Sequence, residues 1–171
     1  MKVLIVSDSH GLTRELEEIK NRHSGKVDAL IHCGDSELPY GSSELQNFLY
    51  VRGNCDFAKE FPEERTEDIE GVRFFITHGH RYNVKMTLMN LYYRAQETGA
   101  KVVCFGHSHI AGAENINGIL FINPGSIYLP RMRKEKTYVI LEIDEEKATV
   151  YFYDIHGNEI PSLSQTFSLL G

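Results

Sequence analysis

The chain has 171 residues, of which 42% are hydrophobic and 25% are charged, as in ordinary globular domains. This length favours one domain over residues 1–171. The formal net charge of −6 argues against stable binding to nucleic acid or to an anionic membrane, because the sequence has no basic stripe to neutralise phosphates. No apolar run approaches the roughly 20 residues that a membrane-spanning helix needs.

The cysteines and the amino terminus indicate a cellular compartment. Cys33, Cys55 and Cys104 are widely spaced and form no CxxC pair. The apolar run at residues 1–6 is too short for a secretory signal and leads directly into polar residues. We therefore expect reduced thiols and a cytoplasmic protein.

Strands and helices alternate in the first part of the chain, and hairpins follow. Helices are predicted over residues 13–22 and 84–97, the second ending before Gly99 as a C-cap. Strands are predicted over residues 3–6, 27–31, 48–51, 72–76 with a hairpin partner ending at 69–71, 102–105, 120–122, 137–143 and 148–153. This order predicts a mixed sheet or two stacked sheets, with the helices outside. The hairpin at the carboxyl end offers an edge strand through which a homo-oligomer can form.

Polar residues and glycines follow five of these strands. The segments are Ser7-Asp8-Ser9-His10, His32-Cys33-Gly34-Asp35, Arg52-Gly53-Asn54-Cys55-Asp56, Thr77-His78-Gly79-His80 and Gly106-His107-Ser108-His109. Ligands of α/β sheets gather at the carboxyl ends of the strands, so we expect these loops to converge. Six of the eight histidines lie in them, which chance placement explains poorly.

Two pairs of side chains have the spacing of metal ligands. Asp8 and His10 lie two residues apart, as do His107 and His109, so in extended segments the members of each pair point the same way. Carboxylate oxygen combined with imidazole nitrogen suits Mn, Fe or Zn better than Ca or Mg. The sequence therefore predicts a transition-metal site.

These five segments, in this order, resemble the motifs of the calcineurin-like metallophosphoesterase superfamily. The resemblance covers about the first 110 residues, and the short chain with its Gly53-Asn54-Cys55-Asp56 loop is similar to the small YfcE-type phosphodiesterases. It implies an α/β fold, a four-layer α/β/β/α sandwich of two mixed β-sheets. It also implies two divalent metal ions per chain, with Mn favoured and Fe, Zn or Ni as alternatives.

The resemblance further implies a set of ligands and a reaction. Asp35 bridges the two ions in this set, and a hydroxide shared by the ions attacks phosphorus. The first ion is expected on Asp8, His10, Asp35 and His109, and the second on Asp35, Asn54, His78 and His107. The implied substrate is a small phosphate ester.

The sequence departs from the superfamily after the asparagine, where larger members carry a histidine that protonates the leaving group. Cys55 occupies that position. A thiol is a weaker acid catalyst than imidazole, so His80 and water remain alternative donors. We place Asn54, Cys55 and His80 in the catalytic group, and we favour diesters because the histidine associated with broader phosphatase action is replaced.

Other polar residues have simpler interpretations. His32 is interpreted as a packed core histidine, and Asp56 as a residue that supports the loop rather than a ligand. The 123–126 loop borders the site, and Arg131 is either a phosphate clamp or a solvated loop residue. The apolar residues of 86–92 are expected to pack a helix on the sheet, with a lid or a subunit contact as the alternative.

Two rival functions remain. A non-catalytic metal-binding scaffold of the same fold, like the retromer subunit of eukaryotes, is one of them, but scaffolds are expected to lose ligands and this chain keeps every position. A metallo-β-lactamase-type hydrolase requires a His-x-His-x-Asp-His run, which this sequence lacks.

Overall fold

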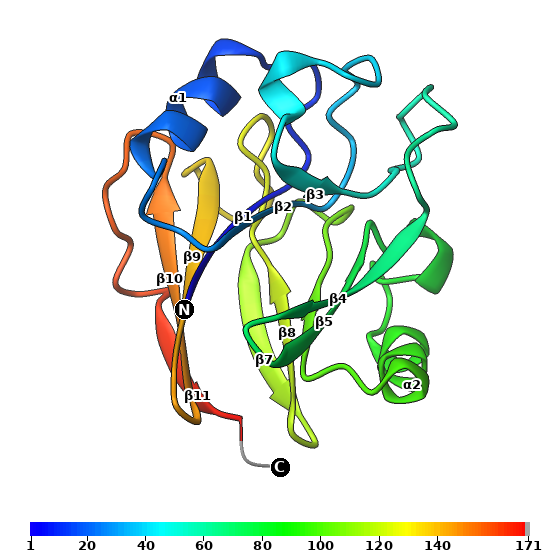
Figure 1. Ribbon diagram of the computed structural model, residues 1–171, viewed down its shortest axis with the longest axis vertical. Coiled ribbons are helices and arrows are strands. Elements are labelled where there is room, and N and C mark those ends of the chain that lie inside the picture. Colours follow the sequence, from blue (N-terminus) through cyan, green and yellow to red (C-terminus); the bar gives the residue numbers. More distant parts are fainter. Residues whose placement is uncertain (170–171) are drawn as a thin grey trace.

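Two mixed β-sheets stack face to face in the computed structural model, which describes residues 1–169 (Figure 1). The first sheet has the order β11-β10-β9-β1-β2-β3 and comprises Gln165–Ser168, Lys147–Asp154, Thr137–Asp144, Lys2–Val6, Ala29–His32 and Phe48–Tyr50. The second has the order β4-β5-β6-β8-β7 and comprises Glu64–Ile69, Val72–Thr77, Val102–Cys104, Ile119–Asn123 and Gly112–Ile116. Helix α1 (Arg14–Arg22) lies outside the first sheet and α2 (Met89–Thr98) outside the second, so the predicted four-layer sandwich is confirmed.

Alternation of side chains along each strand explains the layers. In β1, Val3 and Ile5 point into the core between the sheets, whereas Leu4 and Val6 pack toward α1. In β5, Phe74 contributes to the same inter-sheet core, while Phe75 packs toward α2. Strands that are buried on both faces read as continuous apolar runs, which is why these segments show no polar alternation.

The second helix is shorter than predicted. It begins at Met89 rather than at residue 84, and residues 84–88 form a loop after the left-handed Asn83. Leu91 and Tyr92 are buried against the sheet as expected, but Met86 and Met89 are 79% and 45% exposed. The interpretation of the whole 86–92 set as one buried helical face is therefore wrong, because its first residues are not helical. Gly99 ends the helix in the left-handed conformation, as predicted.

Two strands were not predicted from the sequence. β7 carries the polar residues Glu114 and Asn115, and β11 is a short exposed strand at the carboxyl end. β11 pairs with β10, so the edge strand of the carboxyl hairpin is covered rather than free. The last two residues of the predicted 1–171 domain lie outside the described residues. Within residues 1–169 no helix has the length and apolar character required to cross a bilayer.

Candidate metal centre

The loops after β1, β2, β5 and β6 meet at one end of the two sheets. Backbone hydrogen bonds hold them together: Asp8 N–H donates to Gly34 at 3.0 Å and His10 N–H to Asp35 at 2.9 Å. Gly106 N–H donates to His78 at 3.0 Å. The predicted convergence of strand ends is confirmed, because β1 and β2 are parallel, as are β5 and β6.

The backbone at the candidate ligands is not extended. Positive φ angles occur at Asp8 (54°), His10 (39°), Asp35 (61°), His107 (72°) and His109 (61°). The expectation that each pair converges through an extended segment is therefore wrong. Non-glycine residues in this region cost about 1–3 kcal/mol each and persist where the surrounding contacts enforce them. Left-handed turns, rather than strand alternation, direct these side chains to one place.

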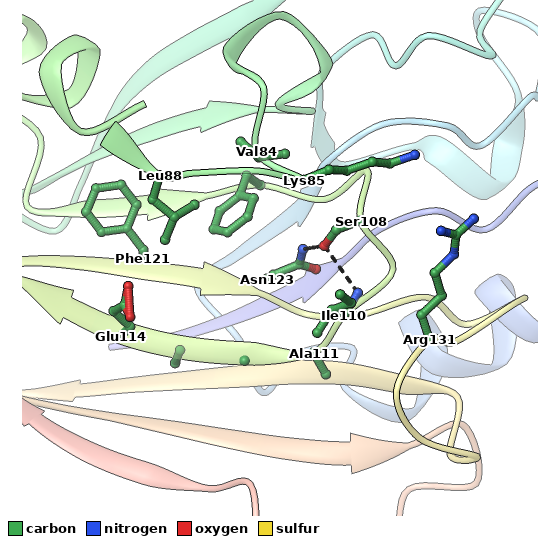
Figure 2. A pocket seen from close by; sticks show the side chains of 13 residues that line it. Val84, Lys85, Leu88, Ser108, Ile110, Ala111, Glu114, Phe121, Asn123 and Arg131 are labelled. Carbon is green, nitrogen blue, oxygen red and sulfur yellow. Dashed lines mark hydrogen bonds between the residues drawn. The ribbon is translucent and has the colours of Figure 1, made fainter. Parts of the chain in front are cut away.

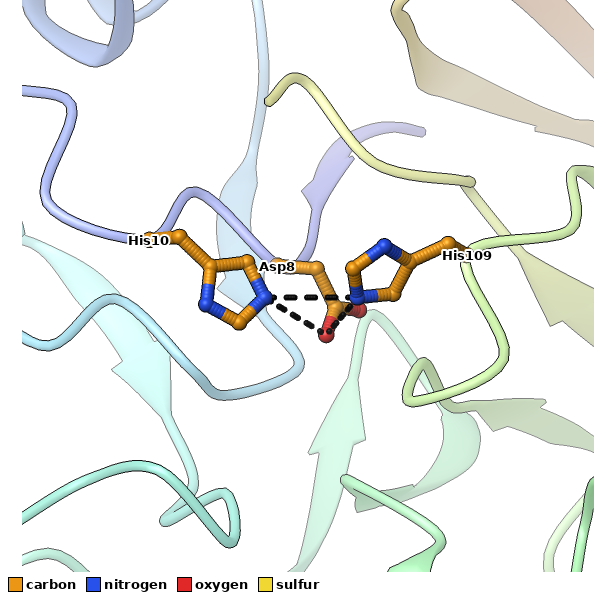
Figure 3. Close-up of side chains that lie close together, drawn as sticks. All are labelled: Asp8, His10 and His109. Atoms are coloured by element: carbon orange, nitrogen blue, oxygen red, sulfur yellow. Dashed lines mark hydrogen bonds and ion pairs between the residues drawn. The ribbon is translucent and has the colours of Figure 1, made fainter. Parts of the chain in front are cut away.

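Asp8, His10 and His109 form a first cluster, drawn in Figure 3. Oδ1 of Asp8 lies 3.2 Å from Nε2 of His109 and 3.7 Å from Nε2 of His10. The two Nε2 atoms are 3.3 Å apart. The carboxylate of Asp8 is fully buried, whereas the His10 and His109 side chains are partly exposed, so the cluster lies at the protein surface over a buried carboxylate.

Asp35, His78 and His107 form a second cluster. Nε2 of His78 lies 3.1 Å from Oδ2 of Asp35 and 3.8 Å from Oδ1 of Asp8, and both carboxylates are buried. The rings of His78 and His107 are 5.1 Å apart. Asp35 also lies within 4.8 Å of ligand atoms of His10 and Cys55, so it adjoins the first cluster as well as the second.

The outer nitrogens of these histidines hold fixed partners. Nδ1 of His10 contacts Oε1 of Glu37 at 3.0 Å. Nδ1 of His109 contacts the carbonyl oxygen of Leu129 at 2.7 Å. Nδ1 of His78 contacts the carbonyl oxygen of Cys33 at 2.8 Å. Because these partners accept hydrogen bonds, each Nδ1 donates its proton outward, and Nε2 is the nitrogen that faces inward and can bind a cation. This is the arrangement of metal-binding histidines.

The site favours positive charge. Burial raises the pKa of Asp8, but the adjacent imidazoles of His10 and His109 lower it well below the usual value. The carboxylate of Asp8 raises the pKa of His10 to about 9. Burial lowers the pKa of His107 to about 4, with help from the charges of His78 and Lys85. The inward-facing carboxylate oxygens and imidazole nitrogens repel one another unless a proton or a cation lies between them.

A divalent cation fits the donors better than protons do. Oδ1 of Asp8 and Nε2 of His78 are buried and have no hydrogen-bond partner within the described part of the chain. A buried carboxylate oxygen that faces three imidazole nitrogens without hydrogen bonds is costly unless a cation binds it. Mixed nitrogen and oxygen donors suit Mn, Fe, Zn or Ni.

Two glycines make room for the carboxylates. A Cβ atom on Gly53 would lie 2.0 Å from Oδ1 of Asp35, and one on Gly106 would lie 2.1 Å from Oγ of Ser7 and 2.5 Å from Oδ2 of Asp8. No side chain fits at either position without displacing a candidate ligand.

Several supporting residues escaped the sequence analysis. Ser7 Oγ donates to Oδ2 of Asp8 at 2.6 Å, Ser126 Oγ to the Asp8 carbonyl at 2.7 Å, and Glu37 orients His10. Ser7 and Glu37 lie within two residues of a predicted ligand, which is a signal that sequence reasoning can use. Ser126 had no such signal, although the 123–126 loop was expected to border the site and does so.

The three predicted catalytic residues line the rim. Cys55 N–H donates to Oδ1 of Asp35 at 2.8 Å, and burial together with Asp35 raises the pKa of the Cys55 thiol to about 11. Asn54 is exposed, and its amide contacts Cys55 Sγ at 3.5 Å. The His80 ring lies 5.5 Å from the His78 ring, and its buried Nδ1 lacks a partner among residues 1–169. Burial and then the charge of His78 lower the pKa of His80.

The interpretations of Asp56 and His32 agree with their contacts. The buried Asp56 carboxylate accepts hydrogen bonds from the N–H groups of Asp35 (2.9 Å), Gly53 (2.7 Å) and Glu37 (2.9 Å), so it holds two site loops together. His32 is fully buried, with Nε2 2.9 Å from Oγ of Ser9.

The amino-acid sequence matches the calcineurin-like phosphoesterase superfamily domain over residues 1–146. The chain belongs to this superfamily. It is 52% identical over 169 residues to the probable metallophosphoesterase YsnB of Bacillus subtilis, covering 99% of this chain and 100% of that one. It is 28% identical to the phosphodiesterase YfcE of Escherichia coli, with 84% and 89% of the two chains covered.

Solved structures share the fold. A predicted phosphoesterase from Streptococcus pneumoniae superposes with a TM-score of 0.94 at 38% identity, covering 98% and 97% of the two chains. Vps29 of Entamoeba histolytica in complex with zinc superposes with a TM-score of 0.77 at 18% identity, covering 99% of each chain, which shows the fold alone. The expected superfamily and fold are thus confirmed.

Proposed function

We propose that this protein is a metal-dependent phosphodiesterase with two divalent ions, Mn favoured, bound at the two clusters. The observation that carries the proposal is the position of Asp35. Its ligand atoms lie within 4.8 Å of those of His10 on one side and of those of His78 and His107 on the other. A carboxylate that adjoins two ligand clusters is suited to bridge two ions. Superfamily membership supports a hydrolase acting on phosphoester bonds.

Asn54 belongs to the proposed ligand set although its amide is exposed. The Cys55 N–H donates to Asp35, so the backbone of the Asn54 loop lies beside the proposed bridging carboxylate, which supports this assignment. We assign the first ion to Asp8, His10, Asp35 and His109, and the second to Asp35, Asn54, His78 and His107. When bound, the ions supply a nucleophilic hydroxide and neutralise the charge of the phosphate.

The chain's own residues position the ligands and handle protons. Asp8 and Asp35 stay ionised because their hydrogen-bond donors lower their pKa values. A phosphate ester is drawn to the resulting site in spite of the net charge of −6, since the cations act locally. His80 and Cys55 are the proposed proton donors to the leaving group. The raised pKa of Cys55 keeps the thiol protonated, although it transfers a proton less readily than imidazole.

The test is hydrolysis of bis-p-nitrophenyl phosphate by metal-stripped protein, with and without Mn²⁺, beside p-nitrophenyl phosphate. Cleavage that requires Mn²⁺ and favours the diester is the expected result. If the protein binds Mn²⁺, Fe²⁺, Zn²⁺ or Ni²⁺ but hydrolyses neither substrate with any of them, the proposed enzymatic function is contradicted and the scaffold function is favoured.

The expected cytoplasmic location belongs to this proposal and is supported by the three free thiols.

A further inference from the structure

A groove of about 440 Å³ lies along the second sheet, beside the loop that carries His107 and His109 (Figure 2). Ser108, which lies between His107 and His109, is at one end of it, and Arg131 N–H donates to the His109 carbonyl at 3.0 Å. The groove therefore adjoins the candidate metal site at the loop that carries two of its histidines, and the charge of Lys85 acts on His107 there. Its size is in the range of small-molecule binding sites.

The walls of the groove are apolar. Val84, Leu88, Phe105 and Phe121 line it beside the α2 layer. Asn123 lines it too, but its amide is engaged: Nδ2 donates to Ser108 Oγ at 3.0 Å and Oδ1 accepts from Gly125 N–H at 2.9 Å. The middle of the groove therefore offers surface to an apolar or aromatic group and few free hydrogen-bonding atoms.

Two cations lie at the metal end. The Lys85 ammonium and the Arg131 guanidinium are drawn at the same end of the groove in Figure 2, away from Leu88 and Phe121. Within residues 1–169 neither side chain has an ion-pair or hydrogen-bond partner, and both are exposed. Unpaired cations beside a metal centre, in a chain of net charge −6, are complementary to an anionic ligand.

Gly112 opens the groove on the β7 side. Gly112 pairs with Asn123, and Glu114 pairs with Phe121, so these residues of β7 share the groove face. A Cβ atom built on Gly112 meets nothing within 4 Å, and the backbone there is not left-handed. The space that a side chain would fill is the space of the groove.

We propose that this groove is the subsite for a ring-sized apolar group of the phosphate ester, whose phosphate lies between Lys85, Arg131 and the metal centre. The substrate class is accordingly an aryl-type or similarly apolar phosphodiester rather than one with two small polar groups. Glu114 at the far end disfavours a second anionic group there. The assignment of the groove to a substrate group rests on the proposed phosphodiesterase function.

The test measures binding rather than turnover, so that its outcome is independent of hydrolysis. The affinities of ethylphosphonate and 2-phenylethylphosphonate for the Mn-loaded protein are determined by isothermal titration calorimetry. The ring is expected to tighten binding about tenfold or more through burial of apolar surface. In Gly112→Leu the two phosphonates should bind with similar Kd values, while the Kd of ethylphosphonate stays within about twofold of the wild-type value. In Gly112→Ala the ratio of the two Kd values should lie between those of the wild type and Gly112→Leu. Lys85→Met should weaken both phosphonates equally, whereas Lys101→Met, at the other end of β6, should weaken neither.

Equal Kd values of the two phosphonates for the wild-type protein would contradict the proposed subsite. Tighter binding of 2-phenylethylphosphonate that persists in Gly112→Leu would contradict it as well. Failure of the proposed function has a different signature. Absence of diester hydrolysis with the ring advantage intact removes the phosphodiesterase and leaves the binding groove, whereas hydrolysis with equal affinities removes the groove alone.

Discussion

Asp35 belongs to the second cluster and also lies within 4.8 Å of the ligand atom of His10 in the first cluster. Its Oδ1 accepts the Cys55 N–H and its Oδ2 faces His78, so one carboxylate fixes the Asn54 loop and contacts the second cluster. The resemblance to the superfamily implied all seven candidate ligands, and six of them lie in the two clusters. Ser126 was missed because its role depends on a contact between distant segments, whereas Glu37 was missed although it lies two residues from Asp35.

We predict that Asp35→Ala lowers diester turnover by about a thousandfold or more and removes at least one of two bound ions. The reason is loss of the only carboxylate shared by the two proposed ion sites. Metal content by elemental analysis and kcat on bis-p-nitrophenyl phosphate are the measurements. Asp68→Ala, which removes an exposed carboxylate on β4, is the control. Full occupancy and turnover in Asp35→Ala would refute the bridging assignment.

His32 is a buried histidine with a defined tautomer. The Gly34 N–H donates to Nδ1 at 3.0 Å, so Nε2 carries the proton and donates to Ser9. Burial lowers the pKa of His32 to about 4, against an unfolded value near 6.5. As pH falls through this window, the unfolded chain takes up a proton that the folded protein does not, so folding stability decreases.

From this shift we expect His32 to contribute a loss of about 2 kcal/mol of unfolding free energy between pH 7 and pH 5. Urea unfolding in the presence of EDTA measures the pH dependence for the wild type, for His32→Gln and for the exposed-histidine control His156→Gln. The pH dependence should decrease in His32→Gln only. An unchanged slope in that variant would show that His32 titrates normally in the folded state.

At the scale of elements, the loops after β1 and β6 touch through Gly106. The apolar runs of both strands were predicted from the sequence, because buried strands need β-branched and aromatic residues on both faces. The left-handed turns at the ligands were not predicted, since Asp and His adopt positive φ only where surrounding contacts enforce it. β7 was missed for a related reason: its polar residues pair with β8 through the backbone.

Gly106→Ala should weaken metal binding about tenfold or more and destabilise the fold by about 1–3 kcal/mol, because the new methyl group overlaps buried Ser7 and Asp8. Metal titration and urea unfolding are the measurements. Gly112→Ala adds the same methyl group in open space and should change neither metal affinity nor stability by a comparable amount. Equal effects of the two substitutions would show that the close approach at Gly106 is not what positions Asp8.

At the scale of the whole molecule, one apolar core joins the sheets. It contains Val3 and Ile5 of the first sheet together with Phe74, Val102 and Leu120 of the second. A shared core of this kind supports the proposal that residues 1–171 form one domain. The two candidate ligand clusters lie where the strand ends of both sheets meet, so their residues come from both halves of the sandwich.

Because ligands from both sheets converge, bound metal should stabilise the whole fold. At a free Mn²⁺ concentration about 100-fold above Kd, we expect stabilisation of about 3 kcal/mol and a rise in Tm of about 5–10 °C over the EDTA-treated protein. Differential scanning calorimetry measures it, with Ca²⁺ as the control cation that the nitrogen-rich site should bind poorly. Identical Tm values with EDTA, Ca²⁺ and Mn²⁺ would contradict a structural role for the ions.

The amino-acid sequence by itself predicted the strands other than β7 and β11, the presence of both helices and the residue types at the strand ends, because periodicity and β-branched runs are local properties. It also determined the superfamily, because five short motifs occur in a set order. Only the tertiary structure decided that left-handed turns aim the candidate ligands, that Ser126 supports one of them, and that an apolar groove adjoins the site, with two cations that have no partner within residues 1–169. Those features arise from contacts between segments far apart in the chain, and no local pattern encodes them.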